Sequence, residues 1–178
     1  MPTLLGLSGD MEGLIADVGA VANVIGLGRG AASTPESDEA VDRLLGIFEP
    51  HQAGAIPVVS MLYQNYDATA ALLIETLLAR HRHTDRAAAV TRTTRVAVAR
   101  TTIDDVPIPA GTVVELDLAG AGLEFGAGDH ACPGRQLAEA IVDGIVSAMD
   151  TAGFEIIDQS STLDANARPV SIVIGTRT

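Results

Sequence analysis

The chain of 178 residues is 47% hydrophobic and 19% charged, which predicts a soluble globular protein with a buried core and argues against disorder. Its net charge of -12 makes nucleic acid and membrane surfaces poor partners, because an acidic surface repels phosphates and anionic lipid headgroups. The single cysteine cannot form an intramolecular disulfide, and residues 1–25 contain acids but no basic residue, unlike a signal peptide or a membrane span. A cytoplasmic location is therefore expected.

The first half of the chain has the apolar spacing of helices. Residues 10–25 repeat apolar side chains at helical intervals, and the glycine- and alanine-rich stretch 26–33 is expected to end this helix. The Thr-Pro-Glu sequence at 34–36 provides an N-cap, a proline in the first turn and an acid that matches the helix dipole. It predicts a second helix to about Phe48. A longer helix is predicted over about residues 57–79.

The second half begins with β-type patterns. Val96 and Val98 alternate with small residues, as in a half-exposed strand. Residues 107–111 contain two prolines and a glycine, which is typical of a tight turn, and the β-branched run that follows predicts a strand at 112–116. Residues 119–122, Ala-Gly-Ala-Gly, are expected to form a loop.

A helix and a hairpin are predicted at the end of the chain. Apolar residues at helical spacing follow Cys132, and Gly153 is expected to end that helix. Residues 154–157 and 170–174 are two apolar runs around a polar loop, which predicts a pair of strands. The sum of these elements is a mainly α fold with small β-sheets, in the α+β class.

Arginines are unevenly distributed in this acidic chain. Six of its eleven basic residues, all arginines, lie between positions 80 and 100. This cluster is interpreted either as a surface for an anion such as a carboxylate, or as a solvated connection after a helix. His81 and His83 lie in the same stretch, and without a nearby set of cysteine or carboxylate ligands they are expected to face solvent.

One loop carries the strongest chemical signal. Cys132 lies within Phe-Gly-Ala-Gly-Asp-His-Ala-Cys-Pro-Gly, residues 125–134, just before the predicted helix. Glycines allow a backbone to approach a flat ligand closely, and a helix N-terminus favours the negative charge of a thiolate. A cysteine at the start of a helix is more often inert. The surrounding pattern instead favours a thiolate ligand of haem iron.

This loop resembles the haem-binding signature of the cytochrome P450 family, Phe-x-x-Gly-x-His/Arg-x-Cys-x-Gly, at every fixed position. The matching residues are Phe125, Gly128, His130, Cys132 and Gly134. By this resemblance Cys132 is the axial ligand of the haem iron, Phe125 packs near the sulfur and His130 contacts a haem propionate. Gly126 and Gly134 are further haem-binding candidates within the same loop.

Two other segments resemble parts of the same family. Residues 90–97 resemble the strand in which the family places an arginine against the other propionate, so Arg95 is a second candidate anchor for haem. Residues 64–69 resemble the oxygen-binding helix, and Asp67 occupies the position of its proton-relaying acid. Ala68 stands where the family has an alcohol, and Thr69 comes one residue late.

Asp67 and Thr69 are therefore the candidate catalytic residues. On a helix a one-residue offset rotates a side chain by about 100°, so Thr69 is not a simple replacement for the missing alcohol.

The resemblance implies a partial cytochrome P450 fold and a single, shortened domain over residues 1–178. The N-terminal half of the family fold is expected to be missing, and so is its Glu-x-x-Arg segment, since no glutamate here is followed three residues later by arginine. The implied function is that of a haem-thiolate monooxygenase, which oxidises a small organic substrate with dioxygen and electrons from a ferredoxin-type partner. The alternative is a non-catalytic remnant that binds haem weakly or acts through contacts with another protein.

Overall fold

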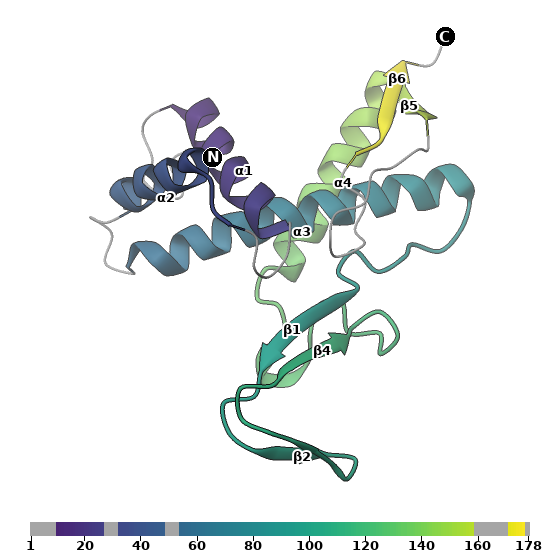
Figure 1. Cartoon of the computed structure of the whole chain (residues 1–178). Helices are drawn as coiled ribbons and strands as arrows, with labels where there is room; N and C mark the ends of the chain where they lie inside the picture. Colours follow the sequence, from purple (N-terminus) through teal and green to yellow (C-terminus); the bar gives the residue numbers. More distant parts are fainter. Residues whose placement is uncertain (1–9, 27–31, 49–53, 159–170, 177–178) are drawn as a thin grey trace. The chain divides into compact units, whose positions relative to one another are not determined.

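The computed structural model describes residues 10–26, 32–48, 54–158 and 171–176 (Figure 1). The helices are α1 (Met11–Gly26), α2 (Pro35–Phe48), α3 (Ala55–Arg82), the short 3-10 helix η2 (Gly128–His130) and α4 (Arg135–Ala152). The strands are β1 (Arg92–Val96), β2 (Thr101–Ile103), β3 (Val106–Ile108), β4 (Val113–Asp117), β5 (Phe154–Asp158) and β6 (Val173–Thr176). The predicted class, mainly α with small β-sheets, is confirmed.

The chain divides into two compact units, Met1–Ala70 and Ala71–Thr178, and the boundary falls within α3. We describe each unit by itself. The expectation of one domain over residues 1–178 stays a prediction.

The first unit is built on α1, α2 and the beginning of α3. The predicted N-cap of α2 is present: the Ser37 N–H donates to Thr34 Oγ1 (3.1 Å), and the Thr34 N–H donates to Ser37 Oγ (2.9 Å). The buried residues of its core are Val18, Val21, Ala40, Leu44 and Phe48. Leucine and valine side chains of α3 pack against this cluster, so the apolar spacing predicted for the helices does form a core.

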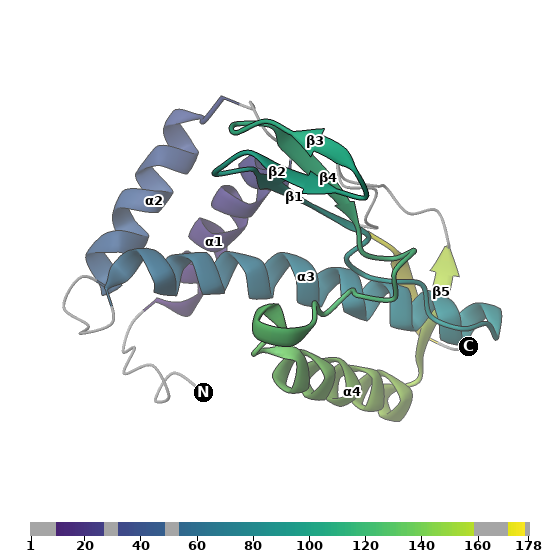
Figure 2. The same cartoon turned by 90° about the horizontal axis from the view of Figure 1, so that it is seen from below.

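In the second unit, α4 runs beside the part of α3 that follows Ala70 (Figure 2). The buried residues between them are Ala71, Leu72, Ala89, Val142 and Val146. Gly153 ends α4 as predicted: its φ is 71°, and its N–H donates to the carbonyls of Asp150 and Met149. The hairpin of β5 and β6 follows, and Ile156 of β5 packs on Ile74 and Leu78 of α3.

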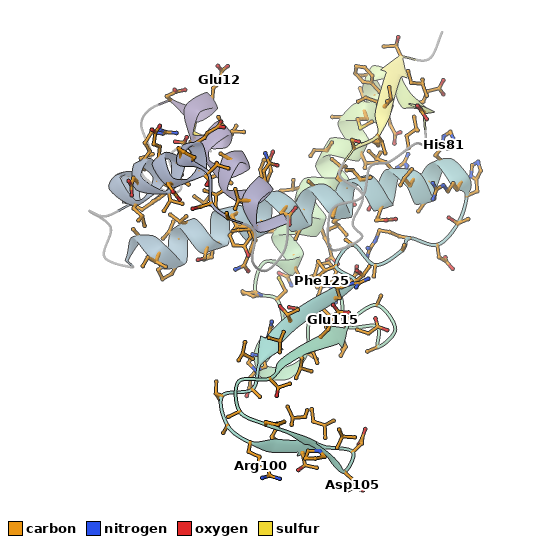
Figure 3. All side chains as sticks on the ribbon, in the orientation of Figure 1. Glu12, His81, Arg100, Asp105, Glu115 and Phe125 are labelled. Atoms are coloured by element: carbon orange, nitrogen blue, oxygen red, sulfur yellow. The ribbon has the colours of Figure 1, made fainter. Side chains whose placement is uncertain are left out.

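Strands in the described residues pair two by two, and every pair is antiparallel: β1 with β4, β2 with β3, and β5 with β6. The β2–β3 hairpin was not predicted. Asp104 and Asp105 form its turn with φ values of 48° and 64°, and Asp105 lies at the tip (Figure 3). The prediction of a strand through Val98 is wrong, because β1 ends at Val96 and Val98 is 97% exposed.

None of the helices among the described residues has the combination of length and apolarity needed to cross a membrane.

Candidate functional site

The cysteine loop, residues 123–134, is closed by its own backbone. The Cys132 N–H donates to the Phe125 carbonyl (2.7 Å), which joins the two sides of the loop. Between them, the His130 N–H donates to the Ala127 carbonyl and the Ala131 N–H to the Gly128 carbonyl, both at 3.1 Å. These bonds form η2 and fix the position of Cys132 before α4 begins. The predicted loop residues from Phe125 to Gly134 therefore form one local structure.

Gly126 is the glycine on which closure of the loop depends. Its φ is 67°, a left-handed conformation, and a Cβ at this position would lie 2.3 Å from the His130 carbonyl oxygen. Gly128 also has a positive φ, 55°, but a Cβ there would meet no atom within 4 Å. A Cβ on Gly134 would make an ordinary contact with Cys132 Sγ at 3.9 Å. Only at Gly126 do both the backbone conformation and the available space require glycine.

The thiol of Cys132 is exposed, two residues before Gly134, the N-cap of α4. Haem brings four nitrogen ligands to its iron, so one accessible protein thiolate is enough to hold the metal from one side. Elsewhere in the part of the chain that the structure describes, no group of three or more His, Cys, Asp or Glu side chains could hold a metal ion. An exposed thiol on a glycine-rich loop fits a haem group, whose remaining iron ligands do not come from the protein.

Phe125 anchors the beginning of the loop. Its ring packs against the buried cluster between α3 and α4. The Arg135 guanidinium lies over the ring, 4.7 Å from its centroid, and Arg135 Nε donates to Glu139 Oε1 (2.9 Å). Sequence reasoning predicted Phe125 but not its contact with Arg135.

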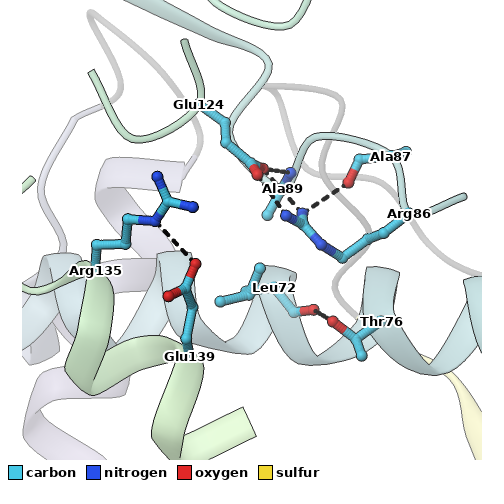
Figure 4. Close-up of polar contacts among 8 residues, drawn as sticks. All are labelled: Leu72, Thr76, Arg86, Ala87, Ala89, Glu124, Arg135 and Glu139. Carbon is cyan, nitrogen blue, oxygen red and sulfur yellow. Dashed lines mark hydrogen bonds and ion pairs between the residues drawn. The ribbon is translucent and has the colours of Figure 1, made fainter. Parts of the chain in front are cut away.

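An ion pair that was not predicted joins Arg86 to Glu124 (Figure 4). Glu124 is the residue directly before Phe125. Arg86 and Glu124 form a two-pronged contact, in which Arg86 Nη1 donates to Glu124 Oε2 (2.9 Å) and Arg86 Nη2 donates to Oε1. The Ala89 N–H donates to the same Oε2 (2.9 Å), and Arg86 Nη1 also donates to the Ala87 carbonyl. No sequence signal marks this pair, since its members are 38 residues apart.

Titration of Glu124 follows from these contacts. The hydrogen bond from Arg86 and then that from Ala89 hold the pKa of Glu124 below its usual 4.5, although partial burial acts against them. A carboxylate with a lowered pKa in the folded protein stabilises the fold above its unfolded pKa. The contribution of Glu124 is therefore complete above about pH 4.5 and is lost as the pH falls through the lowered value.

Three of the six arginines in the cluster form ion pairs with carboxylates of the chain itself. Arg80 pairs with Asp150, Arg86 with Glu124 and Arg92 with Glu115. The sequence suggested either a surface that binds an anion or a solvated connection after a helix. Neither interpretation accounts for the arginines that form these ion pairs. His81 and His83 are exposed, as predicted, and His81 lies at the C-terminal end of α3 (Figure 3).

Arg95 and His130, the two propionate candidates, lie on separate elements of the second unit. Arg95 is exposed on β1, opposite Val114 of β4, and its Nη1 donates to Thr93 Oγ1 and the Thr94 carbonyl, both at 2.8 Å. His130 is exposed at the end of η2.

Asp67 and Thr69 belong to the first unit, and both are half-buried on α3. Thr69 Oγ1 donates to Asn65 Oδ1 at 3.0 Å, so the proton of this hydroxyl already has an acceptor one helical turn away. Ala68 between them is half-buried.

The fold and the cysteine loop together define a class: the chain has part of the cytochrome P450 fold, as the signature predicted. The solved structures that it resembles include P450BioI in complex with an acyl carrier protein ligated to hexadec-9Z-enoic acid. That match has a TM-score of 0.71 and 16% identity, and covers 99% of this chain and 64% of that one.

Two further solved structures also share the fold over nearly the whole of this chain. One is from a study of unusual cytochrome P450-like monooxygenases in microbial secondary metabolism, with TM-score 0.64, 14% identity, and coverage of 99% of this chain and 65% of that one. The other is the haem domain of CYP116B5 from Acinetobacter radioresistens, with TM-score 0.61, 15% identity, and coverage of 99% and 62%. The chain thus spans less than two thirds of the length of each. No protein-family model and no curated protein sequence matches it.

Proposed function

We propose that the chain binds haem through the thiolate of Cys132 and acts as a monooxygenase of the cytochrome P450 type on a small organic substrate. One observation carries this proposal. All five fixed positions of the signature lie in a single loop that is closed by backbone hydrogen bonds and exposes the thiol just before α4. The likeness in fold to cytochrome P450 structures supports the same assignment.

Three residues of the cysteine loop and Arg95 of β1 have distinct parts in this function. Haem, when bound, supplies the iron at which dioxygen is activated. Cys132 holds the iron from one side, and Gly126 keeps the loop closed so that the thiol stays accessible. Arg95 and His130 bind the propionates through charge-assisted hydrogen bonds, which hold a flat ligand in one orientation.

Two kinds of partner follow from this function. The proposed electron donor is a ferredoxin-type protein, and the proposed substrate is a small organic molecule. P450BioI was solved with an acyl carrier protein, so a protein that delivers the substrate is a further option for this chain. We propose a cytoplasmic location and no role for nucleic acid or membrane, because the net charge of -12 repels both.

Arg95→Ala and His130→Ala should each weaken haem retention. Both side chains are exposed, so the loss of one charge-assisted bond should accelerate haem release only about fivefold. The rate of haem transfer to excess apomyoglobin measures this. Arg82→Ala and His81→Ala are the matched controls, since they remove the same side chains from the end of α3 and should change the rate by less than about twofold. Equal effects of all four variants would contradict the assignment of Arg95 and His130.

A second candidate function, that of a non-catalytic protein, is favoured by one observation. Ala68 stands at the position where the oxygen-binding helix of the cytochrome P450 family has an alcohol side chain. The hydroxyl of the neighbouring Thr69 donates to Asn65. Neighbouring residues on a helix point about 100° apart, so Thr69 does not take over the position of Ala68. Such a protein would bind haem weakly or act through contacts with another protein.

Ala68→Thr distinguishes the two candidates. In the unmodified chain, most electrons should reduce dioxygen to hydrogen peroxide, because productive oxidation needs timed proton delivery and Ala68 has no hydroxyl. Adding the hydroxyl should increase the product formed per electron donor consumed, whereas Ala70→Thr, which adds one elsewhere on α3, should not. Product absent from every variant would favour the non-catalytic protein. Tight coupling in the unmodified chain would contradict the role given to position 68.

A further inference from the structure

The Arg86–Glu124 pair differs from the other ion pairs in the described parts of the chain by its burial. The two side chains expose 28% and 19% of their surface, whereas each other ion pair between two described residues has at least one partner that is more than half exposed. An exposed pair contributes little to stability, but a partly buried pair with several hydrogen bonds is costly to break, because it leaves a charge without its partner. This pair is therefore more than a surface contact.

Its position links the cysteine loop to the core. Glu124 directly precedes Phe125, whose carbonyl accepts the hydrogen bond from the Cys132 N–H. Glu124 in turn accepts from Arg86 and from the N–H of Ala89, a residue that is only 3% exposed within the cluster between α3 and α4. The first side of the loop is thus attached to the core immediately before the point where the loop closes on Cys132.

We propose that Arg86 and Glu124 are a positioning pair for the cysteine loop, which hold it in the closed form that presents Cys132. The hydrogen bonds of the pair join its two members to each other and to the backbone of Ala87 and Ala89, and the pair acts on the loop through the backbone of Phe125. The expected effect of the pair on haem retention rests on the proposed function, but its expected effect on the closure of the loop does not. The two can therefore be tested separately.

The first test uses the haem-free full chain and measures amide hydrogen exchange of Cys132 by NMR. Glu124→Gln removes the charge that faces Arg86, and it should accelerate exchange of the Cys132 amide by about tenfold or more. The amide of Ile156 in β5, far from the loop in sequence, should exchange within about twofold of its original rate. A merely global loss of stability would instead accelerate both amides equally, and this result would overturn the proposal.

A matched control and a conservative variant sharpen the test. Asp150→Asn breaks the exposed pair with Arg80 in the same unit and should leave exchange of the Cys132 amide within about twofold. Arg86→Lys keeps the charge but loses the two-pronged geometry, so its effect should lie between those of the unmodified chain and Glu124→Gln. It also serves if Glu124→Gln does not fold. The positioning role would be refuted if the Cys132 amide exchanged at the same rate in all three variants, Arg86→Lys, Glu124→Gln and Asp150→Asn.

The second test adds haem. If the unmodified chain takes up haem, Glu124→Gln should release it to apomyoglobin about tenfold faster, and Asp150→Asn should not. If the unmodified chain takes up no haem, the proposed function fails, but the exchange rates still decide whether the pair positions the loop. Faster exchange of Cys132 without faster haem release would overturn the link to haem.

Discussion

Replacing Cys132 with alanine or serine will abolish the thiolate-type absorption spectrum of the haem-reconstituted protein. The chain has one cysteine, and its methionines bind iron through a neutral thioether, which gives a different spectrum. The hydrogen bond that closes the loop uses the backbone N–H of residue 132, so both variants should keep the loop and the fold.

The serine variant is the better control, because its side chain is close in size to that of cysteine. Circular dichroism should show the same helix content in all three proteins. A thiolate-type spectrum that survives in Cys132→Ala would show that the iron is bound elsewhere or by another group.

Gly126→Ala should have the largest effect on stability of any glycine-to-alanine substitution in the loop. Alanine in a left-handed conformation costs about 1–2 kcal/mol. In addition, its Cβ would lie 2.3 Å from the backbone carbonyl of His130, an overlap that only a shift of the loop relieves. The free energy of unfolding should fall by about 2–4 kcal/mol in total, and haem release should accelerate. Urea unfolding measures the first effect and haem transfer the second.

Two other glycines provide matched controls for that substitution. Gly128→Ala has a positive φ but open space, so it should lose only about 1 kcal/mol. Gly144→Ala lies in the exposed middle of α4, where alanine should stabilise the helix by about 0.5–1 kcal/mol. If Gly126→Ala is no more destabilised than Gly128→Ala, closure of the loop does not depend on the space at Gly126.

The helices were predictable because the signals that fix their ends are local. The cap of α2 at Thr34 and the left-handed Gly153 after α4 were both identified from the residue type and its place beside an apolar repeat. The cysteine loop was predictable for the same reason. Its residues are contiguous in the sequence, so a motif that identifies them also predicts that they lie in one loop.

Contacts between distant segments were not predictable. Arg86 and Glu124 are 38 residues apart, and nothing near either residue indicates the other. The hairpin turn at Asp104 and Asp105 was missed because both adopt positive φ, which sequence rules assign first to glycine. The hydroxyl of Thr69 was considered for proton transfer, but its hydrogen bond to Asn65 was not foreseen.

The ferrous carbon monoxide spectrum of the haem-reconstituted, unmodified chain tests the central claim most directly. We expect the strongly red-shifted Soret band that a thiolate ligand produces, and we expect it to be absent from Cys132→Ser. Failure of the chain to take up haem, or a Soret band without that shift, would contradict a haem-thiolate site at Cys132.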